Sequence, residues 1–268
     1  MVFPNPRVDA EVCGARLRYA RTLEMKLKLP LYLRCLVLSL FCACAATVVH
    51  AEPGPRLAPG IESLPADAKV VIEPIDLELY TLSAGGQREP RADWTDAARR
   101  HVASALREWA AATRLTTVEM DEKTAETHAE LLQLQDTLVD ALVVHHNGPV
   151  RLPAKGGQLD WSFGAAMQPL QQATGARYAL YTYVRDSYAS SERKAVIGAV
   201  AIVAAALSGG SLALLGGGEQ AAYAMLVDLQ TGRVLWFNEL VRLHGDLRDA
   251  APAADSVKAL LAEFPPVK

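Results

Sequence analysis

Residues 177–187 read RYALYTYVRDS, the stretch with the clearest strand character in the chain. Tyr, Leu, Thr and Val dominate it, and β-branched and aromatic residues suit a pleated surface. Further along, the apolar runs 222–228 and 233–241 flank the sequence LQTG, which predicts a β-hairpin. These three runs predict one sheet centred on residues 177–187. The tyrosines near its central strand are expected to pack in the core or in an interface: Tyr178, Tyr181, Tyr183 and Tyr188.

The hairpin turn has a D-x-x-T-G pattern made by Asp228, Thr231 and Gly232. An Asp side chain can accept hydrogen bonds from its own turn, and Gly supplies the positive φ that such turns need. We interpret these three residues as a structural turn rather than a ligand site. Trp236 and Phe237, which follow the turn, are predicted to support the core.

Upstream of the central run, residues 69–82 predict a first strand, in which Pro74 requires an edge position or a bulge because proline donates no ladder hydrogen bond. A helix follows, with Asp93 as its expected N-cap, and residues 116–120 predict another short strand. Apolar residues of this helix recur at spacings of three and four. They are Trp94, Ala98, Val102, Ala105, Leu106 and Trp109.

Three more helices are predicted. The longest covers residues 124–146, a short one ends near Gly175, and the last lies near the C-terminus. Their apolar stripes are Leu131, Leu134, Leu138 and Leu142; Phe163, Met167 and Leu170; and Val257, Leu260, Leu261 and Phe264. The order of elements predicts an α/β fold, a mixed sheet with packed helices, as a single layered domain over residues 69–268.

Residues 195–217, AVIGAVAIVAAALSGGSLALLGG, carry no charge and interrupt this pattern as an apolar, Gly- and Ala-rich helical insert. Their length admits a membrane span, but the segment joins two strands that look like parts of one sheet. A buried or surface-lying helical hairpin is therefore favoured over an element that dips into a membrane or contacts another copy, and over a true span. The expected membrane or partner contacts are Val196, Ile197, Val200, Ile202, Val203, Leu207, Leu212, Leu214 and Leu215.

The first fifty residues have the features of a secretory signal peptide. Basic residues precede the uncharged run 36–49, and a V-x-A site predicts cleavage between Ala51 and Glu52. Counted from Met25 the signal has an ordinary length, so residues 1–24 are expected to be a mis-assigned extension. Residues 25–51 are then the signal peptide, and the Pro- and Gly-rich residues 52–68 are expected to be a linker.

The four cysteines, Cys13, Cys35, Cys42 and Cys44, all precede the expected cleavage site. A disulfide framework or a Cys nucleophile is therefore excluded from the mature chain. Lipidation at Cys44 is the weaker alternative to cleavage, since the residues before it fit a lipobox poorly. Without residues 1–51 the chain has seven bases and three acids fewer, leaving 20 Lys+Arg and 27 Asp+Glu, an acidic balance that argues against nucleic-acid binding.

No catalytic, cofactor or metal motif stands out. The histidines show no HExxH or H-x-x-x-H spacing, and the glycine run 216–218 lacks the Lys-Ser/Thr of a phosphate-binding loop. Asp246 and Asp249 are expected to cap the last helix, with Arg248 pairing one of them, rather than to act as an acid–base pair. We therefore predict no catalytic residue, no cofactor and no metal.

Five stretches taken together resemble a family of exported bacterial envelope proteins and lipoproteins of uncharacterised function. They are GARYALYTYVRDSYAS, the apolar insert, LVDLQTGRVLWFNEL, GDLRD and LLAEFP. The layout is also similar, at fold level, to TolB amino-terminal-like and CsgG-like periplasmic domains. The resemblance implies a Gram-negative protein in the periplasm or at an envelope membrane, and it supplies no catalytic residues.

The sequence therefore predicts a non-enzymatic exported protein that acts as an assembly or interaction module at a membrane or in a secretion-type complex. Its expected partners are other envelope proteins or further copies of itself, with 195–217 as the contact element and possible membrane contact. A periplasmic small-molecule binding domain is the alternative function, and a hydrolase with an unrecognised site is a remote one.

Overall fold

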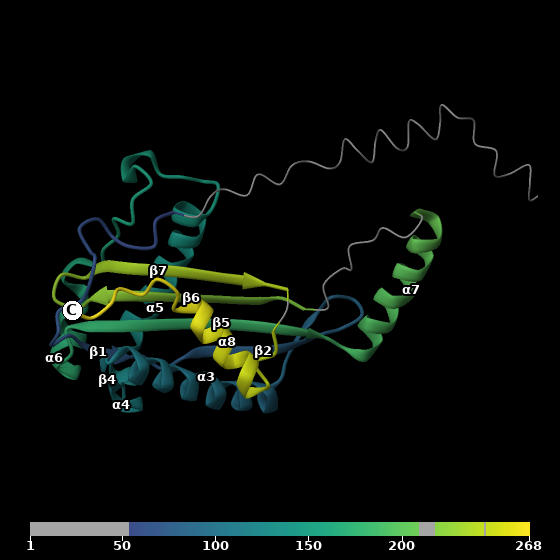
Figure 1. Ribbon diagram of the computed structural model, residues 1–268, viewed down its shortest axis with the longest axis horizontal. Coiled ribbons are helices and arrows are strands. Elements are labelled where there is room, and N and C mark those ends of the chain that lie inside the picture. The colour runs from purple at the N-terminus through teal and green to yellow at the C-terminus, as the bar shows by residue number, and fades with distance from the viewer. Residues whose placement is uncertain (1–53, 209–217, 244) are drawn as a thin grey trace, which may run out of the picture. The chain divides into compact units, whose positions relative to one another are not determined.

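Strand β5 (Tyr178–Ala189) is the central strand of a seven-stranded mixed sheet. The computed structural model describes residues 54–208, 218–243 and 245–268, with the backbone alone for 201–208. On one side of β5 lie β6 (Gln220–Asp228) and then β7 (Arg233–Arg242), each antiparallel to its neighbour. Figure 1 shows these three long strands side by side. The predicted strand and hairpin are confirmed, and β5 and β6 extend slightly beyond the predicted limits.

The other side of β5 pairs with two strands placed end to end, β1 (Lys69–Ile72) and β2 (Asp76–Leu82), both parallel to β5. The single strand predicted over 69–82 is therefore wrong. From Ile72 to Asp76 the chain takes four steps, while their partners on β5, Leu180 and Tyr183, are three apart. Pro74 lies in this irregular stretch, as its missing N–H led us to expect.

The remaining strands are short and extend the sheet at its margin. β4 (Thr116–Glu119) pairs in parallel with β1, and β3 (Arg88–Pro90) pairs antiparallel with β2. The fold is thus a mixed α/β sheet with packed helices, as predicted. The chain passes from β2 to β4 by way of a long helix, and from β4 to β5 by way of several shorter ones. Parallel strands need long crossover connections of this kind, because a tight turn cannot join them.

Helices α3 (Ala92–Thr113) and α8 (Ala250–Leu260) cover one face of the sheet, as Figure 1 shows. The predicted stripe of α3 faces this core, with Ala98, Val102 and Leu106 buried. Asp93 is not its N-cap: Arg91 holds that position without a side-chain cap, and Asp93 lies in the first turn, paired with Arg91 at 2.8 Å. A carboxylate inside the first turn is still stabilised by the positive end of the helix dipole.

The opposite face is covered by α5 (Ala129–Leu142) and α6 (Gln168–Thr174). The helix predicted over 124–146 is instead three elements, α4 (Glu122–Thr127), α5 and a π-helical turn (Val143–Asn147), with a break at His128. Leu142 is fully buried, but Leu134 is 42% exposed, so its predicted place in the core stripe is wrong. Short 3-10 turns lie at Pro153–Lys155 and Gly164–Met167, and Gly175 ends α6 with a φ of 61°.

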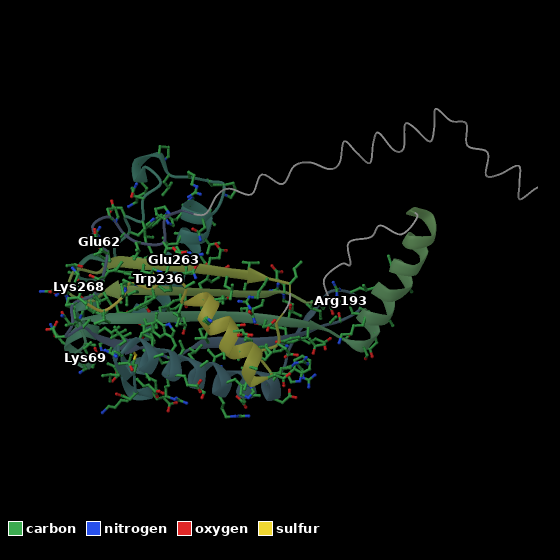
Figure 2. All side chains as sticks on the ribbon, in the orientation of Figure 1. Glu62, Lys69, Arg193, Trp236, Glu263 and Lys268 are labelled. Atoms are coloured by element: carbon green, nitrogen blue, oxygen red, sulfur yellow. The ribbon has the colours of Figure 1, made fainter. Side chains whose placement is uncertain are left out.

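Residues 54–68, expected to belong to a linker, are part of the fold. Ala58 and Leu64 are buried, Leu57 forms a bridge with Trp236 of β7, and Leu64 forms one with Val267. Trp236 and Phe237 are both fully buried, on opposite faces of the sheet, which confirms their predicted role in the core. Figure 2 shows Trp236 over the sheet, with Lys69 and Lys268 together at one end and Arg193 at the other.

Within the predicted insert, α7 (Ser191–Ser208) is one helix that follows β5 directly. The second half of the predicted hairpin, including Leu212, Leu214 and Leu215, lies outside the described residues, as do the side chains of Ile202, Val203 and Leu207. Among the helices that are described, none combines the length and the apolarity that a membrane crossing requires.

Candidate functional site

Large apolar side chains are exposed at the end of the sheet where α7 begins. Of the seven such side chains in the described part of the chain, four lie on α7 or at the end of β7. They are Val196 and Val200, 50% and 49% exposed, and Val241 and Leu243, 53% and 67% exposed. We call these four residues the α7-end surface. Both segments leave the same end of the sheet, because the end of β5, the start of β6 and the end of β7 are in register at Asp186, Gln220 and Arg242.

The outer edge of β7 is covered along only part of its length. Near its start, Phe237 N–H donates to Arg56 O and Leu235 O accepts from Ala58 N–H, each at 2.9 Å. Alternate residues of a strand direct their backbone groups to the same side, so Glu239 and Val241 present theirs to this outer edge. No described residue forms a backbone hydrogen bond with that edge beyond Phe237. Within the described ranges, the second half of β7 is thus an edge without backbone partners, contacted at Glu239 by the Asn147 side chain at 2.8 Å.

A buried polar network fixes the strands at this end. Gln220 Nε2 donates to Asp186 Oδ2 at 3.1 Å, and Ser256 Oγ on α8 donates to Gln220 Oε1 at 3.0 Å. The Tyr188 hydroxyl also donates to Asp186, and it accepts from Leu247 N–H at 2.9 Å. Burial raises the pKa of Asp186 to about 6, although the hydrogen bonds from Tyr188 and Gln220 act against the rise. The network joins β5, β6, α8 and the loop before α8.

The loop before α8 is held by Arg248. Its guanidinium pairs with Asp246 at 2.5 Å and lies over the rings of Trp94 and Tyr188, at 4.6 and 4.1 Å from their centroids. The hydrogen bond from Arg248 lowers the pKa of Asp246. Asp249 is the N-cap of α8 but makes no side-chain cap bond. Asp246 therefore forms an ion pair with Arg248 and does not cap α8. Of the two aspartates expected to pair with Arg248, Asp246 does so.

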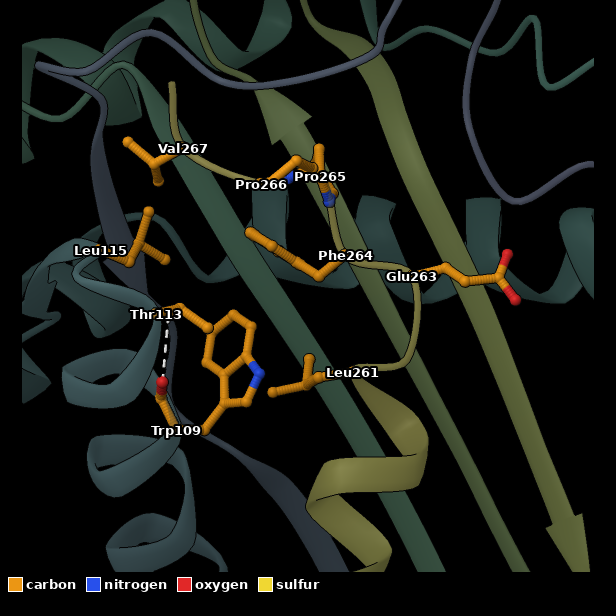
Figure 3. A pocket seen from close by; sticks show the side chains of 9 residues that line it. All are labelled: Trp109, Thr113, Leu115, Leu261, Glu263, Phe264, Pro265, Pro266 and Val267. Carbon is orange, nitrogen blue, oxygen red and sulfur yellow. Dashed lines mark hydrogen bonds between the residues drawn. The ribbon is translucent and has the colours of Figure 1, made fainter.

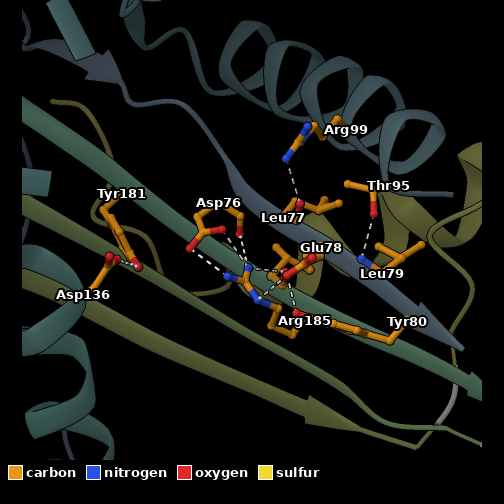
Figure 4. A network of polar contacts seen from close by, with 11 residues as sticks. Asp76, Leu77, Glu78, Leu79, Tyr80, Thr95, Arg99, Asp136, Tyr181 and Arg185 are labelled. Atoms are coloured by element: carbon orange, nitrogen blue, oxygen red, sulfur yellow. Dashed lines mark hydrogen bonds and ion pairs between the residues drawn. The ribbon is translucent and has the colours of Figure 1, made fainter. Parts of the chain in front are cut away.

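A second polar cluster lies between β2 and β5, on the face opposite α3 (Figure 4). Arg185 forms an ion pair with Asp76 at 2.8 Å, lies 4.0 Å from Glu78 and stacks over the ring of Tyr183 at 4.1 Å. The Tyr80 hydroxyl donates to Glu78. Nearby, Tyr181 donates to Asp136 of α5 at 2.6 Å. The charged groups of this cluster are paired with one another. We therefore interpret the cluster as a set of contacts that hold β2 against β5, rather than as a substrate site.

The C-terminal segment encloses a small apolar cavity of about 320 Å³ beside α3 (Figure 3). The Trp109 and Phe264 rings meet edge to face at 4.9 Å, and the wall is completed by residues such as Pro266 and Val267. Glu263 is the one charged residue in the lining of this cavity, and its carboxylate pairs with Arg56 at 2.6 Å. We interpret this cavity as imperfect packing where the tail closes over the core.

The hairpin turn has the predicted geometry. Asp228 Oδ1 accepts from the N–H of Gln230 at 2.9 Å and of Thr231 at 3.3 Å, and Gly232 has a φ of 68°. A Cβ added at Gly232 would lie 2.0 Å from Gly164 O, so this glycine is also required for close approach. Every contact of the turn is internal to the fold.

The adjacent histidines point to different partners. His145 contacts Val150 O at 2.8 Å, while His146 is buried and contacts Pro55 O at 3.0 Å. Burial lowers the pKa of His146. Within the described ranges, no three His, Cys, Asp or Glu side chains come together as metal ligands would; His244 and the glycines 216–217 lie outside those ranges.

Sequence reasoning missed the buried network around Asp186 and Gln220. These residues are 34 positions apart, and nothing in either segment signals that they meet. A polar residue inside an apolar strand, such as Asp186 in β5, was the available signal, because a buried polar group requires a partner.

Comparisons with known proteins give weak structural similarity and no family. No known protein family matches the chain, and no curated protein matches it. A PelC dodecamer structure from Paraburkholderia phytofirmans aligns over 78% of this chain and 96% of its own, at 14% identity and a TM-score of 0.37. Lipoprotein GNA1162 from Neisseria meningitidis covers 74% of this chain and 99% of its own, at 14% identity and a TM-score of 0.30. The LpoB C-terminal domain from Salmonella enterica covers 69% and 87%, at 13% identity and a TM-score of 0.27. Similarity at this level carries no conclusion about what this chain does.

Proposed function

We propose that this chain is an exported, non-enzymatic envelope protein that works as an assembly module, with the α7-end surface as its contact. The observation that carries the proposal is that four exposed apolar side chains, Val196, Val200, Val241 and Leu243, lie on the two segments that leave one end of the sheet. Exposed apolar side chains that gather in one place, rather than being scattered singly, are typical of interaction sites.

The favoured partner is a second copy of the chain. The open half of the β7 edge is a template for strand pairing, and a strand is its own antiparallel complement across a two-fold axis. The other edges are less suited to such pairing. β3 has three residues and ends in Pro90, and β4 carries Glu119, paired with Arg107 at 3.1 Å. Charged side chains and prolines discourage edge-to-edge pairing.

The absence of an enzymatic role is part of the same proposal. At the α7 end the titratable groups satisfy one another: Asp186 is bonded to Tyr188 and Gln220, and Asp246 is bonded to Arg248. A catalytic site instead needs a base, a nucleophile or a charge stabiliser directed at a substrate. Export is supported by the signal features between Met25 and Ala51.

Sedimentation velocity over a range of concentrations tests the assembly. The protein is expected to form a species larger than the monomer, and Val241→Glu with Leu243→Glu should abolish it by placing charges on the contact. Val150→Glu is the matched control, because Val150 is 56% exposed but lies outside the α7-end surface. A monomer at all concentrations, or equal effects of the two substitutions, would contradict the proposal. Dependence of solubility on detergent, lost in the same double variant, would indicate a membrane rather than a second copy.

Mass spectrometry of the chain expressed from Met25 in a Gram-negative host tests export. We expect a mature N-terminus at Glu52. An intact signal or an acylated Cys44 would contradict cleavage at Ala51 and would mean an anchor at the N-terminal end instead.

A further inference from the structure

A buried pair of one carboxyl and one amide side chain joins helix α5 to the sheet. Glu73, just after β1, is 2% exposed, and Gln135 of α5 is fully buried. Gln135 Nε2 donates to Glu73 Oε1 at 2.8 Å. The backbone of Glu73 is fixed as well, because its N–H donates to Leu180 O of β5 at 3.1 Å. The pair therefore connects α5 with the central strands of the sheet.

Each member of the pair has a second oxygen that lacks a donor. Neither Glu73 Oε2 nor Gln135 Oε1 has a hydrogen-bond partner among the described residues. Buried acceptors without donors are destabilising. A protonated carboxyl group has an O–H donor, and the carbonyl of a side-chain amide is an acceptor. A proton on Glu73 Oε2 can therefore satisfy both oxygens at once, by closing a ring of two hydrogen bonds with Gln135.

The surroundings of Glu73 favour its protonated form. Burial raises the pKa of Glu73 to about 7, and the charge of Asp136 on α5 adds to the rise. The Asp136 carboxylate accepts from the Tyr181 hydroxyl of β5 at 2.6 Å, as Figure 4 shows. On the side of α3, β4 and α4, the charged residues that line a cavity together with Glu73 are Arg107, Glu119, Glu122 and Glu126. The one base among them, Arg107, is paired with Glu119, so their net charge also disfavours a carboxylate at position 73.

Few other buried side chains hold α5 against the sheet. They are Val139 and Leu142, so Gln135 is one of three, whereas α3 has six buried residues. The helix begins after a break at His128, which gives it no side-chain cap. Elements with few buried contacts open locally at a lower free energy than the core does. The hydrogen bonds of Gln135 therefore make up a large part of what keeps α5 in place.

We propose that Glu73 and Gln135 form a proton-dependent latch for α5, closed by two hydrogen bonds when Glu73 is protonated and weakened when Glu73 loses its proton. The ionised pair keeps one hydrogen bond and leaves the amide oxygen of Gln135 without a donor beside a carboxylate. When α5 opens, Glu73 reaches water and returns to its ordinary acidity. The open form then holds fewer protons than the closed form, so a rise in pH favours opening. The latch is independent of the proposed assembly at the α7-end surface.

Hydrogen exchange of the full chain, measured by mass spectrometry at pH 5 and pH 8 and corrected for the intrinsic exchange rates, tests the latch. Opening of α5 should increase at least tenfold from pH 5 to pH 8. It should respond weakly to low concentrations of urea, while exchange in α3 responds strongly, because α5 opens by itself and α3 opens only with the whole fold. Glu73→Gln can form both hydrogen bonds as a pair of amides and has no proton to lose. In that variant α5 opening should not vary with pH, while the exposed Glu130→Gln should behave as the parent does.

Glu73→Met separates the latch from the burial of a carboxyl group alone. Methionine also has no proton to lose, so α5 opening should again be independent of pH, but Gln135 loses both of its partners. Opening should therefore be at least threefold greater than in Glu73→Gln at both pH values. Should Glu73→Gln fail to fold, Glu73→Met provides the comparison with the parent across pH.

Four results would overturn the proposal. They are α5 opening in the parent that is the same at pH 5 and pH 8, a pH dependence that persists in either variant of Glu73, equal opening in those two variants, and α5 exchange with the same urea dependence as α3.

Discussion

Replacing Glu73 by Gln should remove a large part of the pH dependence of stability. Burial raises the pKa of Glu73 from 4.5 to about 7; the hydrogen bond from Gln135 opposes the rise and the charge of Asp136 adds to it. In the unfolded chain the carboxyl loses its proton near its ordinary pKa. Between these two values the folded protein holds more protons than the unfolded one, so its free energy of unfolding falls as the pH rises.

The size of the effect follows from the same two values. Each pH unit between them lowers the free energy of unfolding by about 1.4 kcal/mol, so the loss from pH 4 to pH 8 is about 3 kcal/mol. A Gln at position 73 carries no proton to lose. It also brings an N–H₂ group close to Gln135 Oε1, the other acceptor without a partner. The variant should therefore match the parent protein near pH 4 and be about 3 kcal/mol more stable at pH 8.

Urea denaturation followed by circular dichroism, at half-unit steps from pH 4 to pH 8, measures this difference. Asp186, whose pKa is also raised by burial, and His146, whose pKa is lowered by it, are present in both proteins and cancel in the comparison. The exposed Glu130→Gln is the matched control and should not reproduce the gain of about 3 kcal/mol at pH 8. A stability difference between Glu73→Gln and the parent that does not vary with pH, or that grows as the pH falls, would contradict the prediction.

Two other substitutions test the packing of the fold by the same denaturation assay. Gly232→Ala should lose about 2–4 kcal/mol, since a Cβ would lie 2.0 Å from Gly164 O at a φ of 68°; a loss under 1 kcal/mol would mean that the turn can shift. Tyr188→Phe should lose about 2 kcal/mol, because Asp186 loses a donor and the Leu247 N–H loses its acceptor; an unchanged stability would show that water replaces the hydroxyl.

Local patterns predicted the parts of the fold that depend on near neighbours in sequence. The strand character of residues 177–187, the spacing of Ala98, Val102 and Leu106, and the turn formed by Asp228 and Gly232 all depend on residues a few positions apart. Each of these elements is present in the structure.

The features that the sequence did not predict depend on contacts between residues far apart in the chain. The Pro- and Gly-rich residues 54–68 resemble a linker by composition, yet Leu64 is buried because β7 and the C-terminal segment provide partners for it. Glu73 was part of an expected strand, and its burial depends on Gln135, 62 positions away. Of the predicted contact residues, Val196 and Val200 are exposed, while Val241 and Leu243 were not predicted, because the sequence does not show that β7 ends at the same end of the sheet as β5.

Hydrogen exchange measured by mass spectrometry, at protein concentrations below and above the onset of association, tests the central claim most directly. With the α7-end surface as the contact between copies, residues 238–243 and 191–200 should become protected at high concentration, while residues 153–158, in an exposed turn elsewhere, should not change. The open edge of β7 should gain the most, because its backbone N–H groups would acquire partners. Protection that is absent, or that appears only away from these two segments, would contradict the account.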